Sequence, residues 1–181
     1  MNLNYEKKNS DIWFLSKIKT MNILYLHGLD SNLSIEKKEV LEPYGNIIAP
    51  NLDYRANSNM IETLFNQYSN QNIDVIIGSS MGGFTGFYLS KLMQIPALLF
   101  NPALPYRTSV LQNIPVINDN HDHLMQIVIG NQDDVILAKD NLDFIVKLLP
   151  LKNDFRLHLL SELGHGIPVA IFESEVNLFF R

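Results

Sequence analysis

Residues 78–82 read G-S-S-M-G, a match to G-x-S-x-G and the strongest chemical motif in the chain. An apolar run at 75–77 precedes the motif, and a stretch with helical apolar spacing follows it. This strand–turn–helix context is typical of a nucleophile elbow, in which a sharp turn exposes the serine hydroxyl. We predict that Ser80 is a nucleophile and that the backbone amide of Met81 faces a developing oxyanion. The alternatives are a glycine-rich turn without chemistry and a phosphate-binding turn, although no G-K-S/T or G-x-G-x-x-G accompanies it.

A serine hydroxyl needs an adjacent base, and His165 is the residue that we predict for this role. It lies between two glycines, directly after the apolar run at 155–160. Flanking glycines allow a loop histidine to turn back toward the ends of the strands. The alternative for a single loop histidine is an ordinary surface residue.

The third member of such a site is an acid that holds the imidazole in its useful tautomer. We expect it after the apolar run at 127–129, where Asp133 and Asp134 compete. The spacing G-x-x-D-x-V favours Asp133 as the acid and leaves Asp134 as the N-cap of the next helix. The alternative is that both aspartates only cap that helix.

A second oxyanion donor is expected in the loop after the apolar run at 23–26, which begins His27-Gly28-Leu29. We predict that the backbone amide of Leu29 is this donor. His27 is interpreted as a structural residue that holds the loop, rather than as a base.

Short apolar runs alternate with helical stretches along the chain, which predicts an α/β fold with a parallel sheet covered by helices on both faces. Most runs are continuously apolar, as strands buried on both faces are. Asn59 and Glu62 have capping-box spacing, and Pro168 suits a first helical turn. The predicted strands are 23–26, 47–49, 75–77, 97–100, 127–129 and 155–160, and the predicted helices are 34–41, 60–68, 83–93, 138–149 and 168–180.

Composition excludes several other classes of protein. The 181 residues are 46% apolar and 18% charged, with a net charge of −5, which argues against disorder and against a nucleic-acid partner. No cysteine is present, so disulfides, thiolate metal sites and cysteine nucleophiles are excluded. No apolar run reaches the roughly 18 residues of a membrane span, and the N-terminus has no signal-peptide pattern. We therefore expect a cytoplasmic protein.

The first twenty residues do not show the alternation of strands and helices seen in the rest of the chain. We interpret them as an N-terminal extension that could be non-essential, followed by a single domain at 21–181. Met21, which directly precedes the first predicted strand, is an alternative start of this domain.

Weaker signals are given mainly structural interpretations. Residues 118–123 read N-D-N-H-D-H, which we interpret as a solvated loop rather than a zinc site, because no further ligands accompany it. Arg55 and Arg107 are loop residues that could meet an acidic substrate group, although surface arginines are common. The aromatic residues that follow the motif are expected in the core more than in an acyl pocket; they are Phe84, Phe87 and Tyr88.

The ordered set Ser80, Asp133 and His165 resembles the α/β-hydrolase superfamily, in which the triad follows this chain order. More narrowly, the chain is similar to the small bacterial YqiA-like esterases over about residues 21–180. The residues that carry this likeness are 24–29 (L-Y-L-H-G-L), 78–83 (G-S-S-M-G-G), 100–103 (F-N-P-A), 130–135 and 164–165.

The resemblance implies a minimal α/β-hydrolase with sheet order 2-1-3-4-5-6 and carboxylesterase or acyl-thioesterase activity on a small-molecule substrate. It implies no cofactor and no metal. From a different class, the alternative is a non-catalytic binding or regulatory module that keeps this shape. The natural acyl and leaving groups and the oligomeric state do not follow from the sequence.

Overall fold

A six-stranded parallel sheet forms the centre of the protein, in the order β2-β1-β3-β4-β5-β6. The structure, a computed structural model, describes residues 20–106, 110–117, 121–148 and 153–181. The predicted fold class and strand order are confirmed. In chain order the elements are β1 (Met21–Leu26), α1 (Ile35–Leu41), β2 (Gly45–Ile48), α2 (Met60–Tyr68), β3 (Val75–Ser79), α3 (Met81–Met93), β4 (Ala97–Phe100), the 3-10 helix η1 (Leu104–Tyr106), β5 (His121–Gly130), α4 (Ala138–Val146), β6 (Asn153–Leu160) and α5 (Val169–Phe179).

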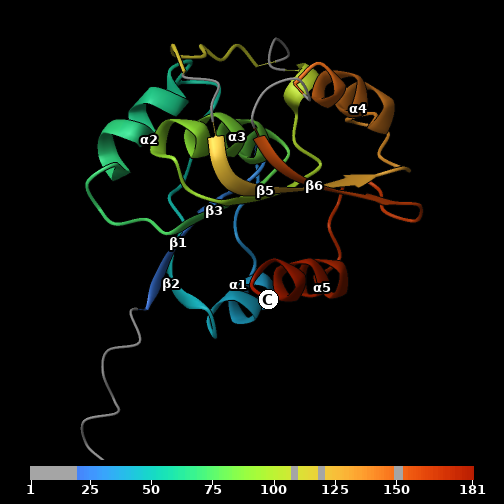
Figure 1. The fold of residues 1–181 in the computed structure, drawn as a ribbon, viewed down its shortest axis with the longest axis horizontal. Coiled ribbons are helices and arrows are strands. Elements are labelled where there is room, and N and C mark those ends of the chain that lie inside the picture. The colour runs from blue at the N-terminus through green and yellow to red at the C-terminus, as the bar shows by residue number, and fades with distance from the viewer. Residues whose placement is uncertain (1–19, 107–109, 118–120, 149–152) are drawn as a thin grey trace, which may run out of the picture.

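Helices cover both faces of the sheet: α2, α3 and α4 lie on one face, and α1 and α5 lie on the other (Figure 1). The packing of strand β1 explains why its residues 23–26 are continuously apolar. Leu24 and Leu26 belong to the core cluster shared with α2, α3 and α4, whereas Ile23 and Tyr25 belong to the cluster shared with α1 and α5. Successive residues of a strand point to opposite faces, so a strand that is covered twice needs apolar side chains at every position.

Strand β5 begins earlier than the sequence predicts. It starts at His121, so the prediction that residues 121–123 lie in a loop is wrong, while residues 118–120 lie outside the described residues. The strand pairs with β6 from His121 opposite Asn153, with a register shift before Leu124. Polar residues and this irregularity conceal the strand from a search for continuous apolar runs.

Several predicted boundaries also shift. The helix predicted at 138–149 already ends at Val146, where the amide of Leu148 donates to the Ile145 carbonyl and closes a tighter turn. Asn59 precedes α2 as predicted, but its side chain does not cap the helix. Its carboxamide oxygen instead accepts a hydrogen bond from Asn113 Nδ2 at 2.8 Å, so a tertiary contact replaces the predicted capping box.

The predicted N-terminal extension falls almost wholly on residues 1–19, which lie outside the described residues, and β1 begins at Met21. The separation of this extension from a domain at 21–181 therefore stays a prediction. Within the described ranges, no helix combines the length and the apolar character that crossing a membrane requires.

Candidate active site

Ser80 lies in a strained turn between β3 and α3, with φ 52° and ψ −118°. Residues other than glycine rarely adopt this backbone conformation, and such strain is concentrated at functional sites. The turn has no space for larger neighbours. A Cβ on Gly82 would lie 2.0 Å from the Leu26 carbonyl oxygen, and one on Gly78 would lie 2.4 Å from the Gly82 oxygen. The amide of Ser80 donates to the Phe100 carbonyl at 3.0 Å and fixes the turn to the end of β4.

The loop after β1 approaches Ser80 from the other side. A Cβ on Gly28 would lie 3.2 Å from the Ser80 Cβ, so the absence of a side chain at Gly28 permits this approach. Leu29, the predicted oxyanion donor, is half-buried and follows directly. Met81 is the first residue of α3, where the backbone amides of a helix have no helical acceptor. The oxyanion roles of Leu29 and Met81 stay predictions.

His27 holds this loop through both ring nitrogens. Its Nε2 accepts from the Leu52 amide at 2.9 Å, so the ring proton lies on Nδ1, which donates to the Gly28 carbonyl at 2.7 Å. The Tyr54 hydroxyl donates to the His27 carbonyl at 2.8 Å, and burial raises the pKa of this tyrosine well above its ordinary value. His27 is buried and has no free nitrogen, which agrees with the structural interpretation.

Asp133 and His165 are brought together although 32 positions separate them. Nδ1 of His165 lies 2.8 Å from Oδ2 of Asp133, and the aspartate side chain is fully covered while the imidazole is 29% exposed. An ionised carboxylate only accepts hydrogen bonds, so Nδ1 is the donor and Nε2 is left to accept a proton. This arrangement can orient an imidazole as a base.

The expected division of roles between the two aspartates is wrong in one respect. Asp134 is exposed and does not cap a helix, because α4 begins only after Leu137. Asp133 supplies the local contacts as well: its Oδ1 accepts from the amides of Val135 and Ile136 at 2.9 and 2.7 Å. These two bonds fix the carboxylate within its own turn and leave Oδ2 for His165.

Ser80, Asp133 and His165 follow β3, β5 and β6 respectively, and all neighbouring strands are parallel. Their loops therefore leave the same edge of the sheet. No direct hydrogen bond joins the described side chains of Ser80 and His165. In catalytic sites such bonds are often long or poorly aligned before substrate binds, so the pairing of Ser80 with His165 stays a prediction.

Asn101 is the site residue whose role sequence reasoning did not identify. It is buried, follows β4 directly and has a positive φ of 41°. Its side chain contacts the loops that carry both Asp133 and His165, through Gly130 and Gly164. The signal in the sequence was the N-P-A segment after the fourth strand, which supported the resemblance but had no assigned function.

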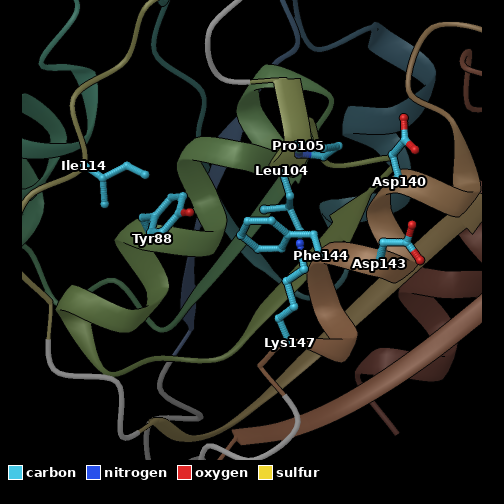
Figure 2. A pocket seen from close by; sticks show the side chains of 8 residues that line it. All are labelled: Tyr88, Leu104, Pro105, Ile114, Asp140, Asp143, Phe144 and Lys147. Carbon is cyan, nitrogen blue, oxygen red and sulfur yellow. The ribbon is translucent and has the colours of Figure 1, made fainter.

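Two cavities lie near these loops. One, of about 640 Å³, has a mainly polar wall that includes Leu29, Asp30 and Arg55. The other, of about 580 Å³, lies between α3, η1 and α4, where Tyr88 faces Leu104 and Phe144 (Figure 2).

Of the three aromatic residues expected mainly in the core, Phe84 and Phe87 are buried. Tyr88 is half-buried and lines the α3–η1–α4 cavity. At the rim of this cavity, Tyr106 donates to the Asp140 carboxylate, and this hydrogen bond raises the pKa of Tyr106.

The two arginines considered as substrate contacts have different outcomes. Arg55 Nη2 lies 2.9 Å from Oδ2 of Asp30, and both side chains are largely exposed. Arg107 lies outside the described residues. In the ranges that the structure describes, no three histidine, aspartate or glutamate side chains gather as a metal site would require.

Comparison with known proteins places the chain in a family. A profile of the uncharacterised protein family UPF0227 matches residues 22–126, more than half of the chain. This match confirms the resemblance to the YqiA-like proteins. No curated protein matches the sequence.

Solved structures with the same fold include esterases and hydrolases. The chain is similar to FphF of Staphylococcus aureus, described as a fluorophosphonate-binding serine hydrolase, with a TM-score of 0.64 and 17% identity over 98% of this chain and 88% of that one. It is similar to a protein of the α/β superfamily from Xanthomonas campestris (0.63, 20%, covering 89% and 97%) and to the Bacillus cereus carboxylesterase (0.61, 15%, covering 94% and 98%). At these identities the likeness establishes the α/β-hydrolase fold.

Proposed function

This chain belongs to the uncharacterised protein family UPF0227, and we propose that it is a serine hydrolase acting on esters or thioesters through an acyl-enzyme. The observation that carries the proposal is the Asp133–His165 hydrogen bond at the sheet edge from which the strained Ser80 turn also projects. A strained serine, an oriented imidazole and a covered carboxylate are the three parts that acyl transfer by serine requires.

In the first half of the reaction, the Ser80 hydroxyl oxygen attacks the acyl carbonyl carbon while Nε2 of His165 accepts the hydroxyl proton. The Asp133 carboxylate stabilises the imidazolium that forms. The amides of Leu29 and Met81 donate to the oxyanion, and each such donor lowers the barrier by roughly 3–4 kcal/mol. The carbon–oxygen or carbon–sulfur bond to the leaving group then breaks, and His165 gives its proton to the departing alcohol or thiol.

In the second half, water attacks the acyl-serine and gives a proton to Nε2 of His165. Collapse of the second tetrahedral intermediate releases the carboxylic acid and returns the proton to Ser80. Every proton transfer uses groups of this chain, the substrate or water, so the proposed chemistry needs no cofactor and no metal.

The two cavities support a substrate with one polar and one apolar part. The 640 Å³ cavity includes Leu29, the proposed oxyanion residue, and polar side chains that suit a hydrophilic leaving group. The 580 Å³ cavity has a mixed lining, in which Tyr88, Leu104 and Phe144 suit an acyl chain of modest length. The charged residues on its wall are Asp140, Asp143 and Lys147. The α3–η1–α4 cavity is joined to the elbow because the Ala103 amide, next to Leu104, donates to the Ser80 carbonyl at 3.0 Å.

Labelling with a fluorophosphonate tests the proposal, with intact-mass measurement of the wild type, Ser80→Ala and His165→Ala. We expect one covalent adduct on the wild type and none on either folded variant, since an activated serine reacts far faster than an ordinary hydroxyl. Hydrolysis of ester and acyl-thioester series that differ in chain length would then identify the preferred substrate class. Absence of an adduct on folded wild-type protein would contradict the proposal and favour the non-catalytic binding module.

A further inference from the structure

Asn101 lies where the three loops of the proposed site meet. It directly follows β4, and the preceding residue, Phe100, accepts the hydrogen bond from the amide of Ser80. The backbone amide of Asn101 in turn donates to the Val128 carbonyl in β5 at 2.8 Å. The backbone at this point is thus joined both to the serine turn and to the strand that leads to Asp133.

The side chain of Asn101 joins the other two loops. Its Oδ1 accepts from the Gly130 amide at 2.7 Å, at the start of the turn that carries Asp133. Its Nδ2 donates to the carbonyls of Gly164 and His165 at 2.8 and 3.3 Å. One carboxamide therefore fixes the relative position of the acid loop and the base loop.

Only 1% of Asn101 is exposed, so its hydrogen bonds are made away from water and are costly to lose. The residue type fits these partners closely. An aspartate could accept from Gly130 but, when ionised, could not donate to the two carbonyls. Asparagine also tolerates the observed φ of 41° better than most residues, and glycine tolerates it best.

We propose that Asn101 is a positioning residue that holds the His165 imidazole in register with Asp133 and with the Ser80 turn. The catalytic consequence of this inference rests on the proposed hydrolase function. The positioning of His165 can be measured without any turnover. The β5–β6 pairing and the bond from the Gln132 amide to the Leu163 carbonyl at 2.9 Å still join the two loops without Asn101. Removing the carboxamide should therefore loosen the site without unfolding the protein.

Asn101→Gly removes the carboxamide without adding backbone strain, and Asn101→Asp keeps the size while removing the donors. We expect each variant to lower kcat by about 10²-fold, the scale of an ångström-sized misplacement, with little change in KM. We also expect the nuclear magnetic resonance signal of the His165 Nδ1 proton, assigned by its loss in His165→Ala, to weaken or exchange faster.

Gln126→Ala provides the matched control, because Gln126 is a buried carboxamide that joins three elements elsewhere. Its Nε2 donates to Glu175 Oε2 at 2.7 Å, and its Oε1 accepts from Arg156 at 2.9 Å. This variant should lower Tm as the Asn101 variants do, yet leave kcat and the His165 signal unchanged.

The outcomes separate the two proposals. Unchanged kcat and an unchanged His165 signal in both Asn101 variants would overturn the positioning role, as would an equal loss of kcat and signal in Gln126→Ala. If the wild type neither reacts with fluorophosphonate nor turns over esters, the proposed function fails. The His165 proton signal in the Asn101 variants then decides the positioning role by itself.

Discussion

Two histidine–carboxylate pairs among the residues that the structure describes are locally alike. Nδ1 of His165 lies 2.8 Å from Asp133, and Nδ1 of His158 lies 2.6 Å from Glu175. In each pair the carboxylate is almost covered, with 0% and 8% exposure, while the imidazole is partly open, with 29% and 22% exposure. Hydrogen-bond geometry alone would therefore not distinguish the two histidines.

Their surroundings differ. His158 lies within β6 and pairs with α5, and Glu175 also accepts from Gln126, so this pair joins two strands to a helix. His165 lies beyond the end of β6, at the edge where the Ser80 turn projects. The place of a pair relative to the strained Ser80 turn, rather than its internal hydrogen bond, therefore distinguishes the candidate catalytic pair from the structural one.

The largest expected difference between the pairs is in turnover. We expect Ser80→Ala and His165→Ala to lower kcat/KM for a reactive ester by about 10⁴-fold or more, because the first removes the proposed nucleophile and the second removes the base that activates it. His158→Ala should retain turnover near that of the wild type. Steady-state kinetics on the three folded variants measures this, and an equal loss in His158→Ala would remove the distinction between the pairs.

Substitution of the two carboxylates should also affect kcat differently, by a somewhat smaller factor than substitution of Ser80 or His165. Asp133→Asn keeps the shape but favours the wrong tautomer of His165, so kcat should fall by about 10³- to 10⁴-fold. Glu175→Gln is the matched change in the other pair and should leave kcat unchanged. A small effect of Asp133→Asn would indicate that another group orients His165.

Substitution in the His158–Glu175 pair should change the stability of the protein rather than its turnover. Glu175→Ala removes the acceptor of the His158 ring and leaves the buried Gln126 amide with only the longer bond to the Glu175 backbone carbonyl at 3.4 Å. This loss should lower the free energy of unfolding by about 1–3 kcal/mol. Chemical denaturation of the wild type and this variant measures the change, with fluorophosphonate reactivity as the control for an intact site. A loss of labelling in the folded variant would mean that the two pairs are coupled.

The smallest effect is expected for an exposed ion pair. The Arg55 hydrogen bond lowers the pKa of Asp30, so this pair stabilises the fold above the ordinary aspartate pKa. The contribution is lost as the pH falls through the lowered folded-state pKa. Thermal unfolding should show a slightly lower Tm for Arg55→Met at neutral pH and no difference in acid. A constant difference at all pH values would exclude the ion pair as its cause.

The strands and the loops that carry Ser80, Asp133 and His165 could be predicted because each is encoded locally, whereas the strand order was implied by the resemblance to a known family. The G-S-S-M-G turn, the glycines beside His165 and the twice-covered apolar strands are patterns of adjacent residues. Local patterns failed where contacts between distant segments compete. Asn59 was expected to cap α2, but Asn113 takes its side chain, and the polar start of β5 is a strand through its pairing with β6.

Sequence patterns are enough to establish the fold class and the residue types that could perform acyl transfer, since a continuous apolar strand and a glycine-flanked serine have few alternative structures. The folded chain is needed to establish which aspartate contacts His165, that Asp133 also fixes its own turn, and that His158 pairs with α5. It also gave Asn101 its partners. The reason is physical: hydrogen bonds between loops 29 to 64 positions apart depend on where parallel strands place their ends, which no short window of sequence contains.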